Sequence, residues 1–288
     1  MPNFAQNQHS MKKVLLSAVL LAGILYSQAQ QLATPQSSPT QTIKQNFGVG
    51  SIELSYSRPG LKGRKVGTDL APYGQVWRTG ANSATTILFS EDVTIGGTSI
   101  KAGKYGLLSI PGAGEWTLII TKDLTINQPA LYKQENDIVR VKAPVKKLAE
   151  KAETFTINFC NFTTSSCILQ MSWENSAVEL PISTNTDEKV MKQINDVFIK
   201  ESKPYYAAAS YYYDNGKDLS KAKEWIDKAS ADPANARAAH VFMLKTRIYQ
   251  KLGDKAGAKA SAEKTLALAT EAKNEEYIKT IQQILATL

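Results

Sequence analysis

Aromatic and cationic side chains are concentrated in one turn-rich stretch of the chain, between Tyr56 and Asn82. Loops on a rigid scaffold commonly carry binding residues, and an Arg fork beside aromatic faces suits an anionic or polar ligand. The turn sequences Pro72-Tyr73-Gly74 and Thr79-Gly80 place these side chains on loops. Six candidate ligand-binding residues follow from this pattern: Arg58, Arg64, Tyr73, Trp77, Arg78 and Asn82.

The same stretch has a local excess of positive charge. It holds five cationic residues and one acidic residue, a formal charge of +4: Arg58, Lys62, Arg64, Lys65 and Arg78 against Asp69. Such a run can also be no more than a solvated surface. Arg58, Arg78 and Asn82 could instead hold the loop in place by hydrogen-bonding backbone carbonyls, so a ligand role and a structural role both remain open.

The sequence contains few of the side chains that usually carry out catalysis or bind metals. His240 is the one histidine after residue 29, and its neighbours Ala239, Val241 and Phe242 suggest a structural place on a helix. This excludes a Ser-His-Asp or Cys-His site within the predicted β domain, residues 41–182, and a His-rich metal site. The carboxylates show no spacing that singles out an acid and base pair, so we assign no catalytic residue, metal or cofactor.

The N-terminus has the pattern of a secretory signal peptide. Lys12-Lys13 precede an apolar run of 13 residues, Val14 to Tyr26, and Ser27-Gln28-Ala29 provides a cleavage site. The apolar run is shorter than the roughly 20 residues that span a bilayer. We predict a signal peptide over residues 1–29, with translation able to begin at Met11, and a periplasmic or secreted protein without a transmembrane segment. Removal of the signal peptide lowers the formal net charge from +8 to +6. A nucleic-acid partner would need a much larger local excess of positive charge, so we expect none.

The composition changes between Pro181 and Asp187, which predicts two domains. A Gln, Ser, Thr and Pro-rich leader over 30–40 is expected to be disordered. Residues 41–182 then alternate apolar and polar side chains, which is typical of strands, and predict an antiparallel β-sandwich or partly closed barrel. The predicted strands are 52–57, 85–90, 93–95, 98–100, 105–110, 116–121, 138–143, 154–162, 168–173 and 177–181, with a short helical interruption near 129–134.

Residues 187–288 have helical spacing and repeat at an offset of 36, so that Tyr213 aligns with Tyr249 and Ala222 with Ala258. Each half predicts a helix, a polar turn and a helix. This resembles the tetratricopeptide repeat, a protein-interaction unit. Flanking helices are expected over 188–200 and 271–288.

Cys160 and Cys167 lie on successive predicted strands of one hairpin. In an oxidising compartment they can form a disulfide if the strand register brings them face to face. The sequence does not determine that register.

Several motifs together resemble the domain of unknown function 2911 family over roughly residues 40–181. They are Tyr56-Ser57-Arg58-Pro59, Lys62-Gly63-Arg64, Pro72-Tyr73-Gly74, Trp77-Arg78-Thr79-Gly80-Ala81-Asn82, Ala84-Thr85-Thr86, Lys101-Ala102-Gly103-Lys104-Tyr105 and Glu115-Trp116-Thr117. The resemblance implies an exported protein of Bacteroidetes-type bacteria, often with a helical repeat extension, and brings no activity with it.

We therefore expect a non-enzymatic envelope protein. Its β domain would bind a polar or anionic small molecule or glycan, and its helical domain would contact a protein partner. Two alternatives remain: a carboxylate-based hydrolase acting on glycans or cell-wall material, and a structural envelope protein without a ligand.

Overall fold

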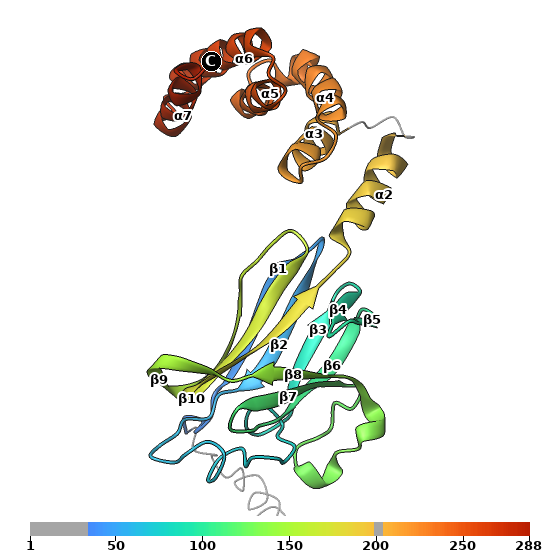
Figure 1. Cartoon of the computed structure of the whole chain (residues 1–288), viewed down its shortest axis with the longest axis vertical. Coiled ribbons are helices and arrows are strands. Elements are labelled where there is room, and N and C mark those ends of the chain that lie inside the picture. The colour runs from blue at the N-terminus through green and yellow to red at the C-terminus, as the bar shows by residue number, and fades with distance from the viewer. Residues whose placement is uncertain (1–33, 199–203) are drawn as a thin grey trace, which may run out of the picture. The chain divides into compact units, whose positions relative to one another are not determined.

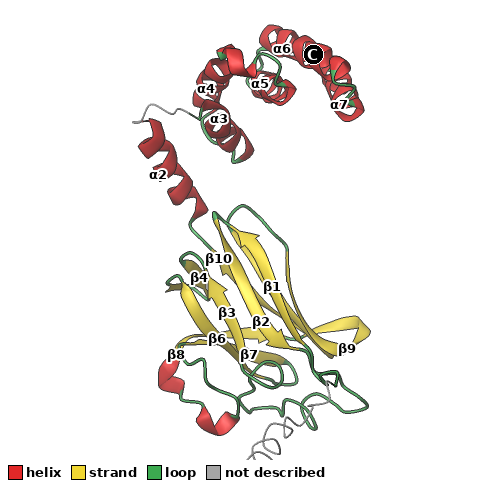
Figure 2. Cartoon of the chain, turned by 180° about the vertical axis from the view of Figure 1, so that it is seen from behind, coloured by secondary structure: helices red, strands yellow, loops and turns green. Residues whose placement is uncertain are grey.

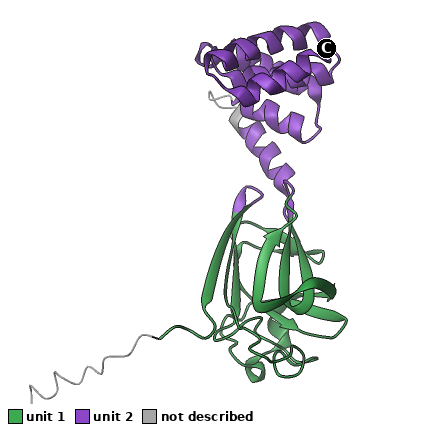
Figure 3. Ribbon diagram, turned by 90° about the vertical axis from the view of Figure 1, so that its left-hand side faces the viewer, with its two compact units in different colours: residues 1–46, 51–162, 167–182 green, residues 47–50, 163–166, 183–288 purple. Residues whose placement is uncertain are grey.

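The computed structural model describes residues 34–198 and 204–288, and the chain divides into two compact units (Figures 1 and 3). The β unit comprises residues up to 46, 51–162 and 167–182, and the helical unit comprises 47–50, 163–166 and 183–288. The predicted fold class, a mainly β part followed by an all-α part, is confirmed. The predicted signal peptide over 1–29 and the first four leader residues lie outside the described residues.

The β unit consists of two sheets that do not close into a barrel (Figure 2). The six-stranded sheet has the order β1-β2-β3-β6-β7-β8 and the four-stranded sheet the order β5-β4-β10-β9. The strands are β1 (Thr40–Phe47), β2 (Gly50–Ser57), β3 (Thr85–Phe89), β4 (Val93–Ile95), β5 (Thr98–Ile100), β6 (Gly103–Ile110), β7 (Glu115–Thr121), β8 (Asp137–Pro144), β9 (Lys146–Cys160) and β10 (Ser166–Ser183).

Local turn chemistry explains the strand pairs that the sequence predicts best. Gly96 and Gly97 join β4 to β5 with φ values of 56° and 78°, a left-handed pair that suits a two-residue hairpin. The helical interruption predicted near 129–134 appears as two short 3-10 turns, η1 (Pro129–Leu131) and η2 (Gln134–Asn136).

Three strands differ from the prediction, each because its apolar pattern is weak or interrupted. β1 is absent from the predicted strands. Its residues alternate between exposed and half-buried positions, but most of the half-buried ones are polar, so the sequence shows no alternation of polar and apolar residues. β9 begins eight residues earlier than expected, because Lys146 to Glu153 is mostly exposed. β10 is one strand rather than two: Glu174, with φ of 54°, forms a bulge where the sequence suggested a turn.

Aromatic residues join the two sheets. The ring of Tyr56 on β2 meets the ring of Phe155 on β9 edge to face at 5.9 Å. The Tyr56 hydroxyl accepts a hydrogen bond from the backbone N–H of Ile157 at 2.9 Å. The side chains of Tyr56 and Phe155 are almost fully buried, so the core lies between the sheets.

The register of β9 and β10 keeps the two cysteines apart. Ile168 lies opposite Cys160. Successive side chains of a strand point to opposite faces, so Cys167 faces the other side of the sheet from Cys160. Both are free thiols, and the disulfide that the sequence left open is not formed in this structure. Burial raises the pKa of both thiols, that of Cys167 to about 11.

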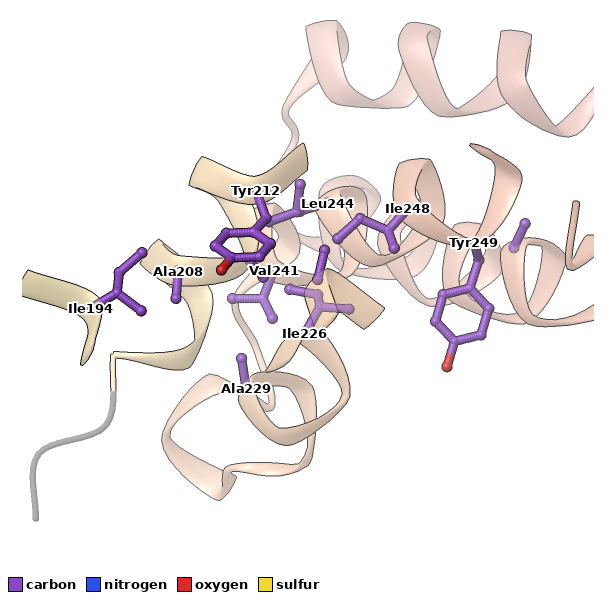
Figure 4. Packing of buried hydrophobic residues seen from close by; sticks show 12 residues of the cluster. Ile194, Ala208, Tyr212, Ile226, Ala229, Val241, Leu244, Ile248 and Tyr249 are labelled. Atoms are coloured by element: carbon purple, nitrogen blue, oxygen red, sulfur yellow. The ribbon is translucent and has the colours of Figure 1, made fainter. Parts of the chain in front are cut away.

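The helical unit contains α2 (Thr186–Phe198), α3 (Tyr205–Asp214), α4 (Leu219–Ala231), α5 (Ala239–Lys251), α6 (Lys255–Glu271) and α7 (Glu275–Leu285). The predicted polar turns act as caps: Asp218 accepts from the N–H groups of Ser220 and Lys221, and Asp254 from that of Gly257. Figure 4 shows Tyr212, Ile226, Val241 and Leu244 gathered in the core of this unit. Within the described residues, none of the helices has the length and apolar character to cross a membrane.

Candidate functional site

The backbone from Trp77 to Thr79 is fixed by pairing with β6. Trp77 exchanges two backbone hydrogen bonds with Ser109, at 2.7 and 3.0 Å. Thr79 is fully buried, and its hydroxyl donates to the Ser109 hydroxyl at 3.0 Å. The Thr85 hydroxyl donates to the Thr79 carbonyl at 2.6 Å. Arg78 therefore projects from a rigid segment.

The ring of Trp77 packs into the aromatic core between the sheets. It stacks on Trp173 of β10, with ring centroids 5.3 Å apart and planes 14° apart. It also meets the edges of Phe155 at 4.9 Å and Trp116 at 6.2 Å. This packing occupies most of the aromatic surface that a ligand platform would offer.

Arg78 lies in the wall of a cavity of about 300 Å³. Its Nη1 donates to the backbone carbonyl of Asn127, whereas its Nε is buried and has no hydrogen-bond partner among the described residues. We call this space the Arg78 cavity, and it is lined by Val76, Trp77, Arg78, Ile126, Asn127, Gln128 and Pro129.

Four of the seven residues that line the Arg78 cavity, Ile126 to Pro129, belong to the segment between β7 and β8. Ile126 is buried in a cluster with Leu108 and Ile119, against which Tyr132 also packs. The Tyr132 hydroxyl donates to the Asp137 carboxylate at 2.5 Å. Burial raises the pKa of Asp137 and, together with that bond, raises the pKa of Tyr132 to about 12. The segment is thus anchored at Ile126, the first of its lining residues, and at Tyr132, beyond the last of them.

Arg58 and Asn82 lie apart from this cavity and make structural contacts. Arg58 donates to the Phe155 carbonyl at 3.4 Å and to the Thr156 hydroxyl at 2.9 Å. Asn82 donates to the Ser38 carbonyl at 3.2 Å and to the Ser57 hydroxyl at 3.1 Å. Two further cavities, of about 430 and 440 Å³, contain Arg58 and Asn82 respectively.

Arg64 and Tyr73 line none of these three cavities. Arg64 folds back to donate to the carbonyls of Leu61 and Gly60, at 3.1 and 3.2 Å. Tyr73 is 46% exposed, and its ring lies so close to Gly67 that a Cβ there would come within 2.3 Å of it. Of the six sequence candidates, the structure therefore brings Trp77 and Arg78 together in one cavity.

The local charge excess is partly neutralised from other strands. Glu153 on β9 accepts from the backbone N–H of Lys62 at 2.8 Å, and Glu174 on β10 accepts from that of Val66 at 3.1 Å. With these two carboxylates beside the loop, five cationic residues face three acidic ones. The field over the loop is correspondingly weaker than the sequence suggests.

The same loop stores backbone strain. Lys62, Ala71, Thr79 and Asn82 have φ values of 49°, 45°, 55° and 60°, in the left-handed region that side chains other than glycine seldom adopt. Such residues cost about 1–3 kcal/mol each and cluster at functional sites, where the surrounding structure holds them. This observation supports a role for the loop beyond connecting β2 to β3.

Sequence reasoning missed the residues from Ile126 to Pro129 that complete the Arg78 cavity. The sequence signal in this segment is Pro129, which indicates the start of a short helical interruption. It does not indicate that these residues line a cavity. Within the described ranges, 34–198 and 204–288, no group of three or more His, Cys, Asp or Glu side chains is arranged to hold a metal ion.

Comparison with known proteins identifies a family whose function is not known. Searches among curated proteins and among solved structures found no match. The model of a family described as protein of unknown function, DUF2911, matches residues 38–182. The match includes the whole loop between β2 and β3 and every residue that lines the Arg78 cavity. The chain belongs to the DUF2911 family.

Proposed function

We propose that this chain is a non-enzymatic, exported envelope protein whose β unit binds a polar or anionic small molecule or glycan in the Arg78 cavity. The observation that carries the proposal is the state of the Arg78 guanidinium. It lines a cavity, and no carboxylate among the described residues lies within ion-pair distance of it. A buried donor without a partner is costly, and an anionic ligand would remove that cost.

A thermal-shift screen against carboxylates, phosphates and sugar acids tests this proposal. We expect at least one compound to raise the melting temperature of the wild type, and Arg78→Gln to abolish the response. A ligand present at 100 times its Kd stabilises by about 2.7 kcal/mol, which is a shift of several degrees.

Arg64→Gln is the matched control, because Arg64 also hydrogen-bonds backbone carbonyls but lies outside the cavity. It should respond to ligand as the wild type does. If Arg78→Gln lowers stability by more than about 2 kcal/mol and no compound distinguishes it from Arg64→Gln, Arg78 serves only to hold Asn127 and the proposal is wrong.

Export is the second part of the proposal. It rests on Lys12-Lys13, the apolar run from Val14 to Tyr26 and the small residues Ser27 and Ala29, with cleavage after Ala29. The implied setting is the envelope of a Bacteroidetes-type bacterium.

The helical unit is the proposed protein-contacting part, as a tetratricopeptide-like repeat. Its support is the helix–turn–helix pairing of α3 with α4 and of α5 with α6. On α5, His240, Arg247 and Lys251 are exposed and share one stripe at helical spacing. Two aromatic rings of α3 adjoin it: Tyr206 meets the His240 ring at 4.9 Å, and Lys251 Nζ lies 5.0 Å from the Tyr213 ring centre. This basic and aromatic stripe suits an acidic segment of a partner.

Cross-linking in the native envelope fraction, followed by mass spectrometry, tests export and partner contact together. Peptides from residues 11–29 should be absent, and cross-links should involve Lys251 and one recurring protein. The double variant Arg247→Glu, Lys251→Glu should lose that protein. Recovery of residues 11–29, or an unchanged partner with the double variant, would contradict the respective part.

A further inference from the structure

The Arg78 cavity combines a single charged group with apolar walls. Val76, Ile126 and Pro129 provide the apolar surface. Arg78 is the one charged residue among the seven that line it. Two more apolar side chains on the same segment, Leu124 and Leu131, are 42% and 44% exposed and stand on either side of the lining residues in the sequence.

This lining is a poor match for phosphates and for sugars. A phosphate group with two negative charges is usually held by several cations or backbone N–H groups, whereas this cavity offers one guanidinium. A sugar usually needs many hydrogen-bond partners and a free aromatic face. The Trp77 ring is already stacked on Trp173 and covered by Phe155.

The free edge of the guanidinium suits one carboxylate. Nη1 is taken by the Asn127 carbonyl, which leaves the edge formed by Nε and Nη2. That edge presents two parallel N–H groups, the geometry of a bidentate pair with a carboxylate. Nε is closed off from solvent, so the Arg78 side chain or its immediate neighbours must shift enough to admit an oxygen atom to this edge.

We propose that the ligand of the Arg78 cavity is a small amphipathic monocarboxylate. Its carboxylate pairs with the Nε–Nη2 edge of Arg78, and its apolar body lies against Val76, Ile126 and Pro129. The proposal rests on the proposed binding function and narrows it to a chemical class. At about 300 Å³ the cavity is at the lower end of the range for small-molecule sites, so the apolar body is short.

Calorimetric titration of the full chain with the straight-chain alkanoates from acetate to octanoate tests the class. Each added methylene should tighten Kd by about fourfold until the cavity is full, after which Kd should stay level. The 1-alkanol of equal length should bind at least about tenfold more weakly, because it lacks the charge that pairs with Arg78. This comparison uses the wild type and so depends on no variant.

Two variants locate the site. Arg78→Gln should bind each alkanoate as weakly as the matching alkanol, while Arg64→Gln should bind as the wild type does. If Arg78→Gln does not fold, Arg78→Lys keeps the charge but not the paired N–H groups, and a partial loss of affinity for the alkanoates is expected.

The outcomes separate this inference from the broader proposal. If acetate and octanoate bind equally, or inorganic phosphate or a sugar phosphate binds more tightly, and Arg78→Gln removes that binding, the monocarboxylate class is wrong while the binding function stands. If the chain-length dependence survives unchanged in Arg78→Gln, the alkanoates bind elsewhere and the inference is overturned. If no anion distinguishes Arg78→Gln from Arg64→Gln, the binding function itself fails.

Discussion

Replacing Trp77, a partly buried residue, with alanine should destabilise the β unit by about 3 kcal/mol, the lower end of the range for truncating an aromatic residue in a packed core. The indole stacks on Trp173 and meets Phe155 and Trp116, three residues that are at most 3% exposed. Its removal would leave a cavity between the sheets that rigid strands cannot close. Tryptophan fluorescence and near-ultraviolet circular dichroism during denaturant unfolding would measure the loss.

Tyr73→Ala is the control for this prediction, because Tyr73 is an aromatic residue of the same loop that is 46% exposed. It should cost less than about 1 kcal/mol. A Trp77→Ala variant as stable as Tyr73→Ala would mean that the ring is available to a ligand, as the sequence suggested, rather than committed to the core.

Asp227→Ala should destabilise the helical unit by about 2–3 kcal/mol, since it removes several bonds to one charged group. Asp227 on α4 accepts from the Tyr249 hydroxyl at 2.6 Å and pairs with Lys245 at 2.9 Å, both on α5. It also pairs with Lys223 at 3.0 Å. The two ammonium groups lie 4.5 and 5.4 Å from the Tyr249 ring centre, so the variant leaves them close together without their shared carboxylate.

The effect should depend on pH in a defined direction. Burial alone would raise the pKa of Asp227, but the bonds from Tyr249, Lys245 and Lys223 outweigh it and leave the pKa below its usual value. A carboxyl with a lowered folded-state pKa contributes stability above its unfolded pKa, and this is lost as pH falls through the folded value. The difference in the free energy of unfolding between the wild type and Asp227→Ala should therefore be fully present at pH 7 and should shrink below about pH 4.

Glu224→Ala provides the matched control on the same helix. Glu224 pairs with Lys228 on the exposed face of α4, four residues away. An exposed pair of this kind contributes only about 0.3–0.5 kcal/mol. Unfolding should be followed at 222 nm, where the helices dominate the signal. An Asp227→Ala variant no less stable than Glu224→Ala would show that the network does not join α4 to α5 in solution.

The sequence determined those parts of the fold whose signals are local. Gly96-Gly97 fixes a hairpin through its own backbone freedom, and Asp218 and Asp254 cap the helices that follow them within three residues. The change from strand to helical periodicity after Pro181 predicted the two parts of the chain. In each case the residues that determine the structure lie within a few positions of one another, so one-dimensional patterns carry the information.

The tertiary structure decided which of the candidate residues lie together. Arg78 meets Asn127, 49 residues away, and this contact completes the cavity. Glu153 and Glu174 come from distant strands to offset the cationic loop. The direction of each cysteine depends on a register that neither strand determines alone. These features arise from contacts between strands far apart in the chain, and side-chain spacing along one segment holds no record of them.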